Sequence, residues 1–327
     1  MRVLVATDRI GALPSPDAGA AIGRAFRDAR AQVQVAVVPL AAGGIDLALA
    51  LSALNDPAIV ITTGDPPADL GLDLTASSVE VGRRLADALS DRPPRVVVDL
   101  SGLVSLDGGA GILAALGAEA DVPLDQGVSG LEGLTRMELA PVRERLGDTE
   151  LIGVVDSSEI ADMLLGLRGL VVRRGHAVGA APTDLLPADS ALGALAGALG
   201  MIDGPGLGAG GGTALALRAL GAVVTSGPAL CAHVAGLDRT AAVADVLVTG
   251  TDALDFADRG GPVVTEMAGL AERVLTPCIA LARDVQISAR ELRTHGLEVA
   301  YALGGDAQLT PAELTARAAG PAQSWTW

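Results

Sequence analysis

Aspartates stand at the ends of the predicted strands, and they are the side chains of this sequence best suited to acid–base or metal chemistry. One Asp at a strand end is typical of a capped turn, whereas three or four that face one cleft can hold Mg²⁺ or act as a general base. The strand-end carboxylates are Asp8, Asp99, Asp107, Asp156, Asp252 and Asp255. The sequence therefore indicates chemistry that depends on carboxylates.

The stretch 96–118 joins one of these aspartates to a glycine turn. A run of β-branched residues stops at Asp99, and Asp107 is followed by Gly108, Gly109 and the small residues of a predicted helix. Backbone N–H groups at such a helix start favour an anion, and phosphate is the anion that we expect. The alternative is a tight turn whose glycines only relieve crowding.

Two further glycine turns raise the same question. Gly43 and Gly44 follow the second predicted strand, and Gly206, Gly208 and Gly211 formally satisfy the dinucleotide pattern G-x-G-x-x-G. That pattern requires a strand before it, whereas a helix is predicted here, and no acidic residue stands about 20 positions on. An NAD site is therefore disfavoured, and the glycines indicate close helix packing or a phosphate.

Composition excludes several function classes. All 23 basic residues are arginines, so chemistry that needs a lysine ammonium is ruled out. The three histidines are scattered and the two cysteines have apolar neighbours, so neither a triad nor a zinc cluster is indicated. The net charge of −16 argues against nucleic acid and anionic membranes. With no apolar leader or bilayer-length segment in the sequence, we expect a cytoplasmic protein.

Strands and helices alternate along the chain, which predicts an α/β fold with a doubly wound parallel sheet. Strands are expected at 2–7, 33–38 and 58–62, and again at 246–249, 278–282 and 297–303; residues 170–172 are a further candidate. Each chain end alone has too few strands for a full sheet. We therefore predict a discontinuous Rossmann-like domain (1–62 and 243–327) with an inserted α/β domain (63–242) and a connector at 63–74.

The carboxylates, the glycine turns and the absence of a nucleophilic His, Cys or Lys arrangement favour phosphoryl transfer to a small hydroxylated acid. No Walker or protein-kinase signature is present. The sequence resembles the glycerate kinases of the bacterial two-domain type. Asp107-Gly108-Gly109-Ala110-Gly111 is similar to the end of the family's G-G-S-A-T-N-D-G-G-A-G loop, and the segments 75–89, 206–227 and 237–255 parallel other family segments in the same order.

The resemblance implies ATP and Mg²⁺ as cofactors, and a small hydroxy acid, glycerate, that is converted to 2-phosphoglycerate. It implies catalytic roles for Asp8, Asp107 and Asp255, with Asp107 and Asp255 as Mg²⁺ ligands or acting on the substrate hydroxyl. The residues in matching loops become candidates for binding substrate or nucleotide: Arg9, Gly43, Gly44, Ser105, Gly108, Gly109, Gly111, Gly208, Gly210, Gly211 and Arg259.

The sequence departs from the family pattern in the loops that the resemblance assigns to catalysis and binding. The first family loop, P-D-S-F-K-G-S-L-S, corresponds to residues 7–13, which lack its Lys. The second family loop corresponds to residues 41–47, where neither of its acidic residues has an acidic counterpart at the matching position. In the last loop Thr251 stands in place of a Glu. One hypothesis is an active, divergent kinase in which Arg9 or Arg259 replaces lost Lys charges. The other is a pseudoenzyme whose scaffold binds a ligand or a protein. The oligomeric state is left open.

Overall fold

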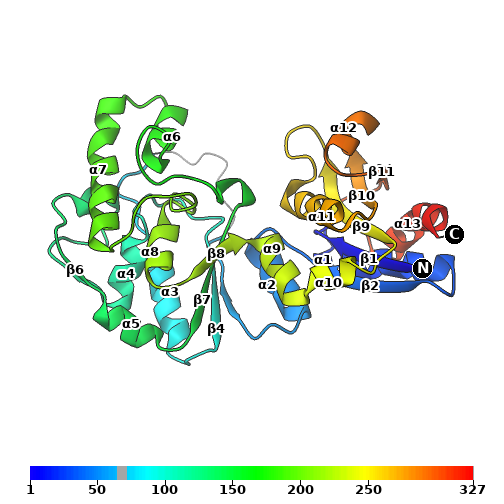
Figure 1. Cartoon of the computed structure of the whole chain (residues 1–327), viewed down its shortest axis with the longest axis horizontal. Helices are drawn as coiled ribbons and strands as arrows, with labels where there is room; N and C mark the ends of the chain where they lie inside the picture. Colours follow the sequence, from blue (N-terminus) through cyan, green and yellow to red (C-terminus); the bar gives the residue numbers. More distant parts are fainter. Residues whose placement is uncertain (65–71, 327) are drawn as a thin grey trace. The chain divides into compact units, whose positions relative to one another are not determined.

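The computed structural model describes residues 1–64 and 72–326, so most of the connector expected at 63–74 lies outside the described residues. Two compact units divide the chain (Figure 1). The first contains Met1–Asp56 and Gly227–Trp327, and the second contains Pro57–Ser226. The chain therefore passes between the units twice, after Asp56 and after Ser226, where the sequence analysis placed the divisions after 62 and 242.

Both chain ends contribute strands to one sheet in the first unit. Its order is β11-β10-β9-β1-β2, and every neighbouring pair is parallel. The strands are β1 (Arg2–Thr7), β2 (Gln34–Pro39), β9 (Val246–Leu254), β10 (Cys278–Val285) and β11 (Val299–Ala302). β1 is apolar from Val3 to Ala6 and β9 from Val246 to Val248, as expected of a parallel sheet that helices cover on both faces.

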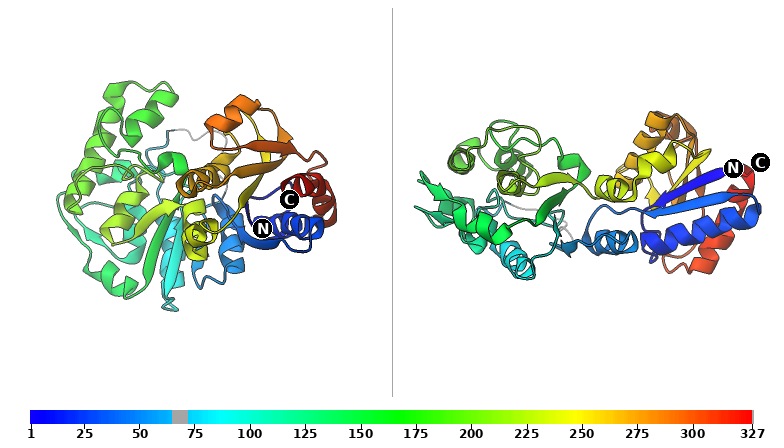
Figure 2. Two further views of the ribbon diagram at one scale, coloured as in Figure 1. Left: turned by 45° about the vertical axis from the view of Figure 1, so that its right-hand side comes forward. Right: turned by 60° about the horizontal axis from the view of Figure 1, so that its bottom comes forward.

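Helices lie on both faces of this sheet (Figure 2). α1 (Ser15–Ala29) and α13 (Pro311–Trp325) share a core with β1 and β9 on one face, and α11 (Gly261–Val274) contacts β9 from the other. The remaining helices are α2 (Gly44–Ala53), α9 (Gly227–Ala235), α10 (Leu237–Ala241) and α12 (Ala289–Thr294). α13 begins with a capping box in which Thr310 and Glu313 are paired reciprocally.

The strand order of the first sheet reverses beside β1. The chain steps from β1 to β2 in one direction, whereas β9, β10 and β11 follow one another on the opposite side of β1. In open parallel sheets such a reversal creates a crevice at the carboxyl ends of the two central strands, and ligands bind there. The fold therefore directs attention to the residues that end β1 and β9.

The second unit has a four-stranded parallel sheet that keeps chain order and so has no reversal of this kind. Its strands are β3 (Ile59–Ile61), β4 (Arg95–Asp99), β7 (Glu150–Val155) and β8 (Val223–Ser226), and a separate ribbon pairs β5 (Glu119–Ala120) with β6 (Met137–Glu138). Its helices are α3 (Val79–Leu89), α4 (Ala110–Leu116), α5 (Ala140–Leu146), α6 (Leu170–Ala177), α7 (Pro182–Ala198) and α8 (Thr213–Ala219).

The predicted fold class is confirmed, with two strand assignments corrected. β3 was expected beside β1 and β2, but it pairs with β4 because the chain has already entered the second unit at Pro57. Residues 170–172 begin helix α6 instead of forming a strand. Leu170, Val171 and Gly175 are buried while Arg173 and His176 are exposed, a spacing typical of a helix.

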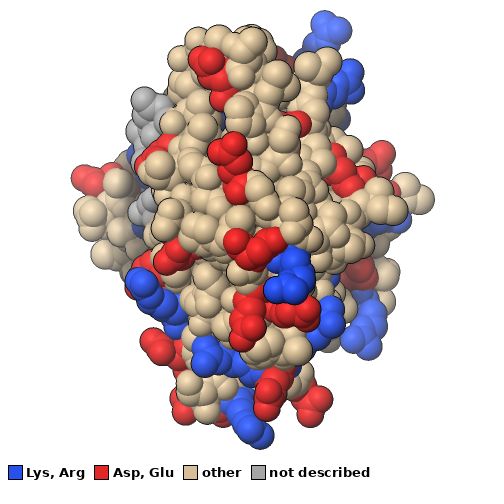
Figure 3. All heavy atoms as spheres, turned by 90° about the vertical axis from the view of Figure 1, so that its left-hand side faces the viewer, with Lys and Arg blue, Asp and Glu red and all other residues tan. Residues whose placement is uncertain are grey.

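The surface and the helices bear on possible partners. On the face displayed in Figure 3, arginines lie among carboxylates and form no continuous basic patch. Nucleic acid requires clustered cations, which this face does not offer. Among residues 1–64 and 72–326, no helix has both the length and the apolar composition that are needed to cross a bilayer.

Candidate active site

Asp8 occupies the position that the fold singles out, immediately after β1. Its backbone N–H donates to the Gly250 carbonyl of β9 (2.9 Å), which fixes the loop to the neighbouring strand. Its Oδ1 accepts from the Arg9 backbone N–H (2.7 Å). Burial raises the pKa of the half-buried Asp8 to about 6; the Arg9 N–H opposes this rise, and the nearby charge of Asp46 adds to it. Asp8 is therefore a more basic carboxylate than an exposed aspartate.

The neighbour of Asp8, Arg9, forms an ion pair with Asp46 of α2. The Arg9 guanidinium contacts Asp46 Oδ2 at 3.2 Å, and its Nε donates to the Gly11 carbonyl at 3.3 Å. Asp46 lies in the first turn of α2, where the helix dipole favours a negative charge. Gly43 and Gly44 form the turn before it, and Gly44 has a left-handed φ of 64° with open space around the position of a Cβ. The Arg9–Asp46 ion pair thus joins the two predicted loops, the one with Asp8 and Arg9 and the one with Gly43 and Gly44.

A second ion pair joins β9 to β10 in the same unit. Arg283 Nε and one of its terminal nitrogens each donate to Asp252 at 2.8 Å, and Asp252 Oδ1 also accepts from the Gly11 N–H at 2.9 Å. The Arg283 hydrogen bonds hold the pKa of Asp252 below its usual value. This bidentate pair ties the loop after β1 to the ends of β9 and β10.

Asp107, by contrast, is completely buried in the second unit. Its two oxygens accept hydrogen bonds from the N–H groups of Ser78, Gly109 and Gly111 and from the hydroxyls of Ser77 and Ser78. The helix-start amides of α4 were expected to be open to a phosphate, but this internal carboxylate already occupies them. The geometry favours a structural role for Asp107, joining the starts of α3 and α4.

The glycine loop before α8 packs against the Asp107 loop. The Gly108 N–H donates to the Gly211 carbonyl at 3.4 Å, and a Cβ on Gly211 would lie 1.8 Å from the carbonyl oxygen of the buried Ser105. Gly208 donates to the Asp162 carbonyl, and Gly210 donates to the Glu159 carboxylate at 2.7 Å. These glycines allow close backbone approach, and the N–H groups of Gly108, Gly208 and Gly210 are satisfied within the protein.

Comparison with known proteins agrees with this architecture. The family model described as "Glycerate kinase family" matches residues 67–320. The chain belongs to the glycerate kinase family. It is 30% identical over 236 residues to an uncharacterized protein of Mycobacterium bovis, covering 70% of this chain and 56% of that protein. It is 27% identical to a glycerate kinase of Halalkalibacterium halodurans, covering 70% and 63%, and 25% identical to the glycerate 2-kinase of Escherichia coli K12, covering 72% and 64%.

A solved structure has the same fold. The crystal structure of a candidate glycerate kinase 2 from Salmonella typhimurium LT2 matches with a TM-score of 0.77 at 22% identity, covering 99% of this chain and 96% of that one. In the sequence comparisons, the matched region spans less than two thirds of the length of these curated relatives.

The other candidates from the family resemblance lie on the loop after β9. Asp255 Oδ1 accepts from the N–H groups of Ala257 and Asp258, the geometry of a capped turn. Arg259 is exposed with a left-handed φ of 57°. Asp46, Asp252 and Arg283 were not proposed as site residues. The strand-end position of Asp252 pointed to it, but nothing in the sequence indicated its pairing with Arg283.

Taken within its own unit, neither proposed Mg²⁺ ligand, Asp107 or Asp255, fits a metal centre. Five donors already occupy the oxygens of Asp107, and two backbone N–H groups donate to Asp255 Oδ1. In the described ranges, no three His, Cys, Asp or Glu side chains are grouped as a metal site requires. We therefore derive no catalytic step from a metal held by these residues.

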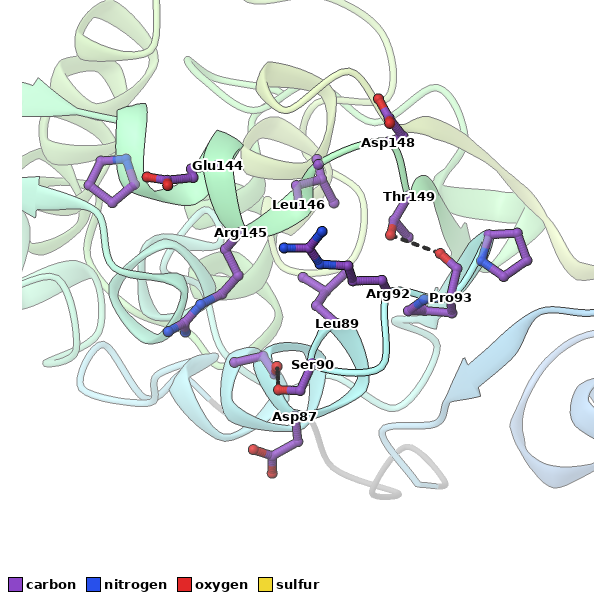
Figure 4. Close-up of a pocket in the computed structure, with 14 residues that line it drawn as sticks. Asp87, Leu89, Ser90, Arg92, Pro93, Glu144, Arg145, Leu146, Asp148 and Thr149 are labelled. Carbon is purple, nitrogen blue, oxygen red and sulfur yellow. Dashed lines mark hydrogen bonds between the residues drawn. The ribbon is translucent and has the colours of Figure 1, made fainter.

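The two units contain two further hollows, and Arg259 is one of the residues that line the second. A cavity of about 830 Å³ opens at the amino-terminal ends of β4 and β7, lined by Pro93, Pro94, Asp148 and Thr149, with Arg92 near its middle (Figure 4). A second, of about 640 Å³, lies along α11 and the end of α12. Because ligands of parallel sheets collect at carboxyl ends, the first hollow is not our candidate site.

Proposed function

We propose that this protein is an ATP-dependent kinase that phosphorylates a hydroxyl group of glycerate or of a closely related small hydroxy acid. Membership of the glycerate kinase family supports the reaction class. The observation that carries the proposal is the position of Asp8: a carboxylate of raised pKa at the carboxyl end of β1, beside the reversal of strand order.

Asp8 would act as the general base. Its carboxylate accepts the proton of the substrate hydroxyl while the hydroxyl oxygen attacks the γ-phosphorus of ATP. The bond from that phosphorus to the β–γ bridging oxygen breaks, ADP leaves, and phosphoglycerate remains. With a pKa near 6, Asp8 is mostly ionised at pH 7 yet more basic than an ordinary carboxylate, which suits a base. By resemblance to the family, the product is 2-phosphoglycerate.

A pseudoenzyme is the second candidate, and two observations favour it. The chain has no lysine to neutralise phosphate charge, and the amides around Asp107 are already hydrogen-bonded internally. In that case the scaffold would bind a small acid, a nucleotide or a protein without transferring phosphate. Arginine can neutralise phosphate, so the absence of lysine does not decide between the two.

Turnover of ATP with a panel of hydroxy acids tests the proposal. The chain is incubated with ATP, Mg²⁺ and glycerate, lactate or tartrate, and ³¹P NMR identifies the phosphorylated product. We expect phosphoglycerate from glycerate, and the shift of the new signal distinguishes the 2- from the 3-phosphate. If every acid leaves ATP unchanged while glycerate or ATP still binds, the pseudoenzyme is the correct reading.

A further inference from the structure

Arg9 and Arg283 each pair with an aspartate near the ends of β1, β9 and β10, and they differ in how easily they can reach a ligand. Arg283 is clamped to Asp252 by two hydrogen bonds of 2.8 Å, and its side chain is 27% exposed. Arg9 makes one contact to Asp46 and one to a backbone carbonyl, and its side chain is 52% exposed. Recruiting Arg283 would break a bidentate pair, which is among the strongest contacts in proteins.

Arg9 keeps donors for a further partner. A guanidinium has five N–H groups, and the contacts of Arg9 to Gly11 and Asp46 use two of them, so three have no acceptor in the described part of the chain. These donors form the planar fork that matches a carboxylate. Asp46, whose side chain is only 18% exposed, holds the guanidinium in the ion pair, and the charges of both groups act on the pKa of Asp8.

An acidic ligand needs such a cation here. Asp8, Asp46 and Asp252 all contribute negative charge to this end of the sheet, and Asp284 near the end of β10 and Asp306 after β11 act on Arg283. An organic acid entering among them is repelled unless a guanidinium pairs with its carboxylate. A neutral polyol meets no such barrier and gains nothing from Arg9.

We propose that Arg9 binds the carboxylate of the substrate and so makes this site select hydroxy acids over neutral polyols. The proposal rests on the proposed function for the identity of the substrate. It assigns the selectivity to a residue of this chain's own loop, and it places the substrate carboxylate beside Asp8, with the hydroxyl on the adjacent carbon directed at the base.

Binding of glycerate and of its neutral amide, glyceramide, tests this assignment without requiring turnover. Dissociation constants are measured by NMR titration of the full chain for the parent and for Arg9→Gln, Arg9→Lys and Arg24→Gln. Arg24 is an exposed arginine of α1 that pairs with no other side chain among the described residues, and it serves as the matched control. Melting temperatures are compared first, and Arg9→Lys tests charge without the planar fork.

We expect the parent to prefer glycerate, and Arg9→Gln to weaken glycerate binding roughly 10- to 100-fold, the range for a hydrogen bond to a charged group. Glyceramide binding should stay within about twofold, Arg24→Gln should match the parent, and Arg9→Lys should fall between. A preference for glycerate that survives in Arg9→Gln overturns the assignment, as does a parent that binds the two ligands equally or binds neither. A parent that selects glycerate through Arg9 but never consumes ATP would contradict the kinase and leave the assignment standing.

Discussion

Asp8 is the residue at which function and stability oppose one another. Its folded-state pKa is about 6, against an ordinary value of 3.8, so between these pH values the folded chain binds more protons than the unfolded chain. Stability from this group is therefore fully present below about pH 4 and is lost as the pH rises through 6. At neutral pH the buried charge of Asp8 lowers the free energy of unfolding.

Asp8→Asn should therefore stabilise the protein in a pH-dependent way. The amide keeps the acceptor for the Arg9 N–H and removes the buried charge, so we expect a gain of about 1 to 3 kcal/mol at pH 8. At pH 3.5 the gain should be close to zero because the parent Asp8 is then protonated. Urea unfolding at the two pH values measures the difference, and an equal effect at both would show that Asp8 is not desolvated.

Asp107 should prove to be a structural residue. Replacing it with Asn exchanges one acceptor oxygen for an NH₂ group, which then faces N–H and O–H donors without an acceptor. We expect a loss of about 2 to 4 kcal/mol in the free energy of unfolding. Asp255→Asn, on a turn that Asn also caps well, should lose about 0.5 kcal/mol or less. Denaturant titration compares the two; equal, small effects would argue that Asp107 is free for chemistry.

The sequence could identify these residues but not their environments. A run of apolar residues ending at Asp shows that Asp8 follows a strand, and the strand order then places it. The partners of Asp107 include Ser77 and Ser78, about thirty residues earlier, and no local pattern announces that pairing. The same holds for Arg283 and Asp252, which meet only because β9 and β10 are neighbours.

At the scale of elements, α11 ends in a strained residue. Leu275 has a left-handed φ of 54° at the C-cap, and it is 91% exposed, so its side chain contributes little burial. Glycine is favoured at such positions because it has no Cβ to crowd the carbonyl.

Leu275→Gly should raise the free energy of unfolding by about 0.5 to 1 kcal/mol, since relief of backbone strain exceeds the added entropy of the unfolded chain. Glu272→Gly, one turn earlier in the same helix and also exposed, is the control and should lose about 1 kcal/mol. Thermal or urea unfolding measures both. If Leu275→Gly destabilises as much as Glu272→Gly, the left-handed conformation is not a source of strain.

Periodicity predicted most elements because long apolar runs and capped helices are local signals. The first strand matches its prediction of 2–7, and the last helix begins at Pro311 after its capping box. Residues 170–172 failed because three apolar residues are compatible with both a short strand and one buried helix turn. In the structure Leu170 and Val171 share an apolar core with Leu185 and other apolar residues of α7, and this long-range packing favours the helix.

For the whole molecule, the continuous second unit should fold by itself. Pro57–Ser226 contains all four strands of its sheet and its own apolar cores. We expect a 57–226 fragment to unfold cooperatively in urea, whereas a 57–149 fragment, which lacks β7 and β8, should not. Circular dichroism follows both. A gradual, non-cooperative transition of 57–226 would mean that the unit depends on the rest of the chain.

The assignment of β3 shows what strand alternation cannot determine. After two strand–helix units, a third strand can either extend the first sheet or begin a second sheet. The apolar run that predicts the strand is the same in both cases, so the local sequence does not distinguish them. The sequence predicted correctly that both chain ends build one sheet, since neither end has enough strands alone. It could not show that the chain leaves that sheet before Ile59, because the pairing of Ile59 with Val96 is long-range.

The pH dependence of glycerate phosphorylation tests the central claim, that Asp8 is the base of a kinase, most directly. We predict that kcat/KM for glycerate rises with pH to a plateau, with an apparent pKa near 6, and that Asp8→Asn lowers it by roughly 10² to 10⁴ and removes this rise. A parent profile that is flat from pH 5 to 8, or an Asp8→Asn variant as active as the parent, would contradict the account.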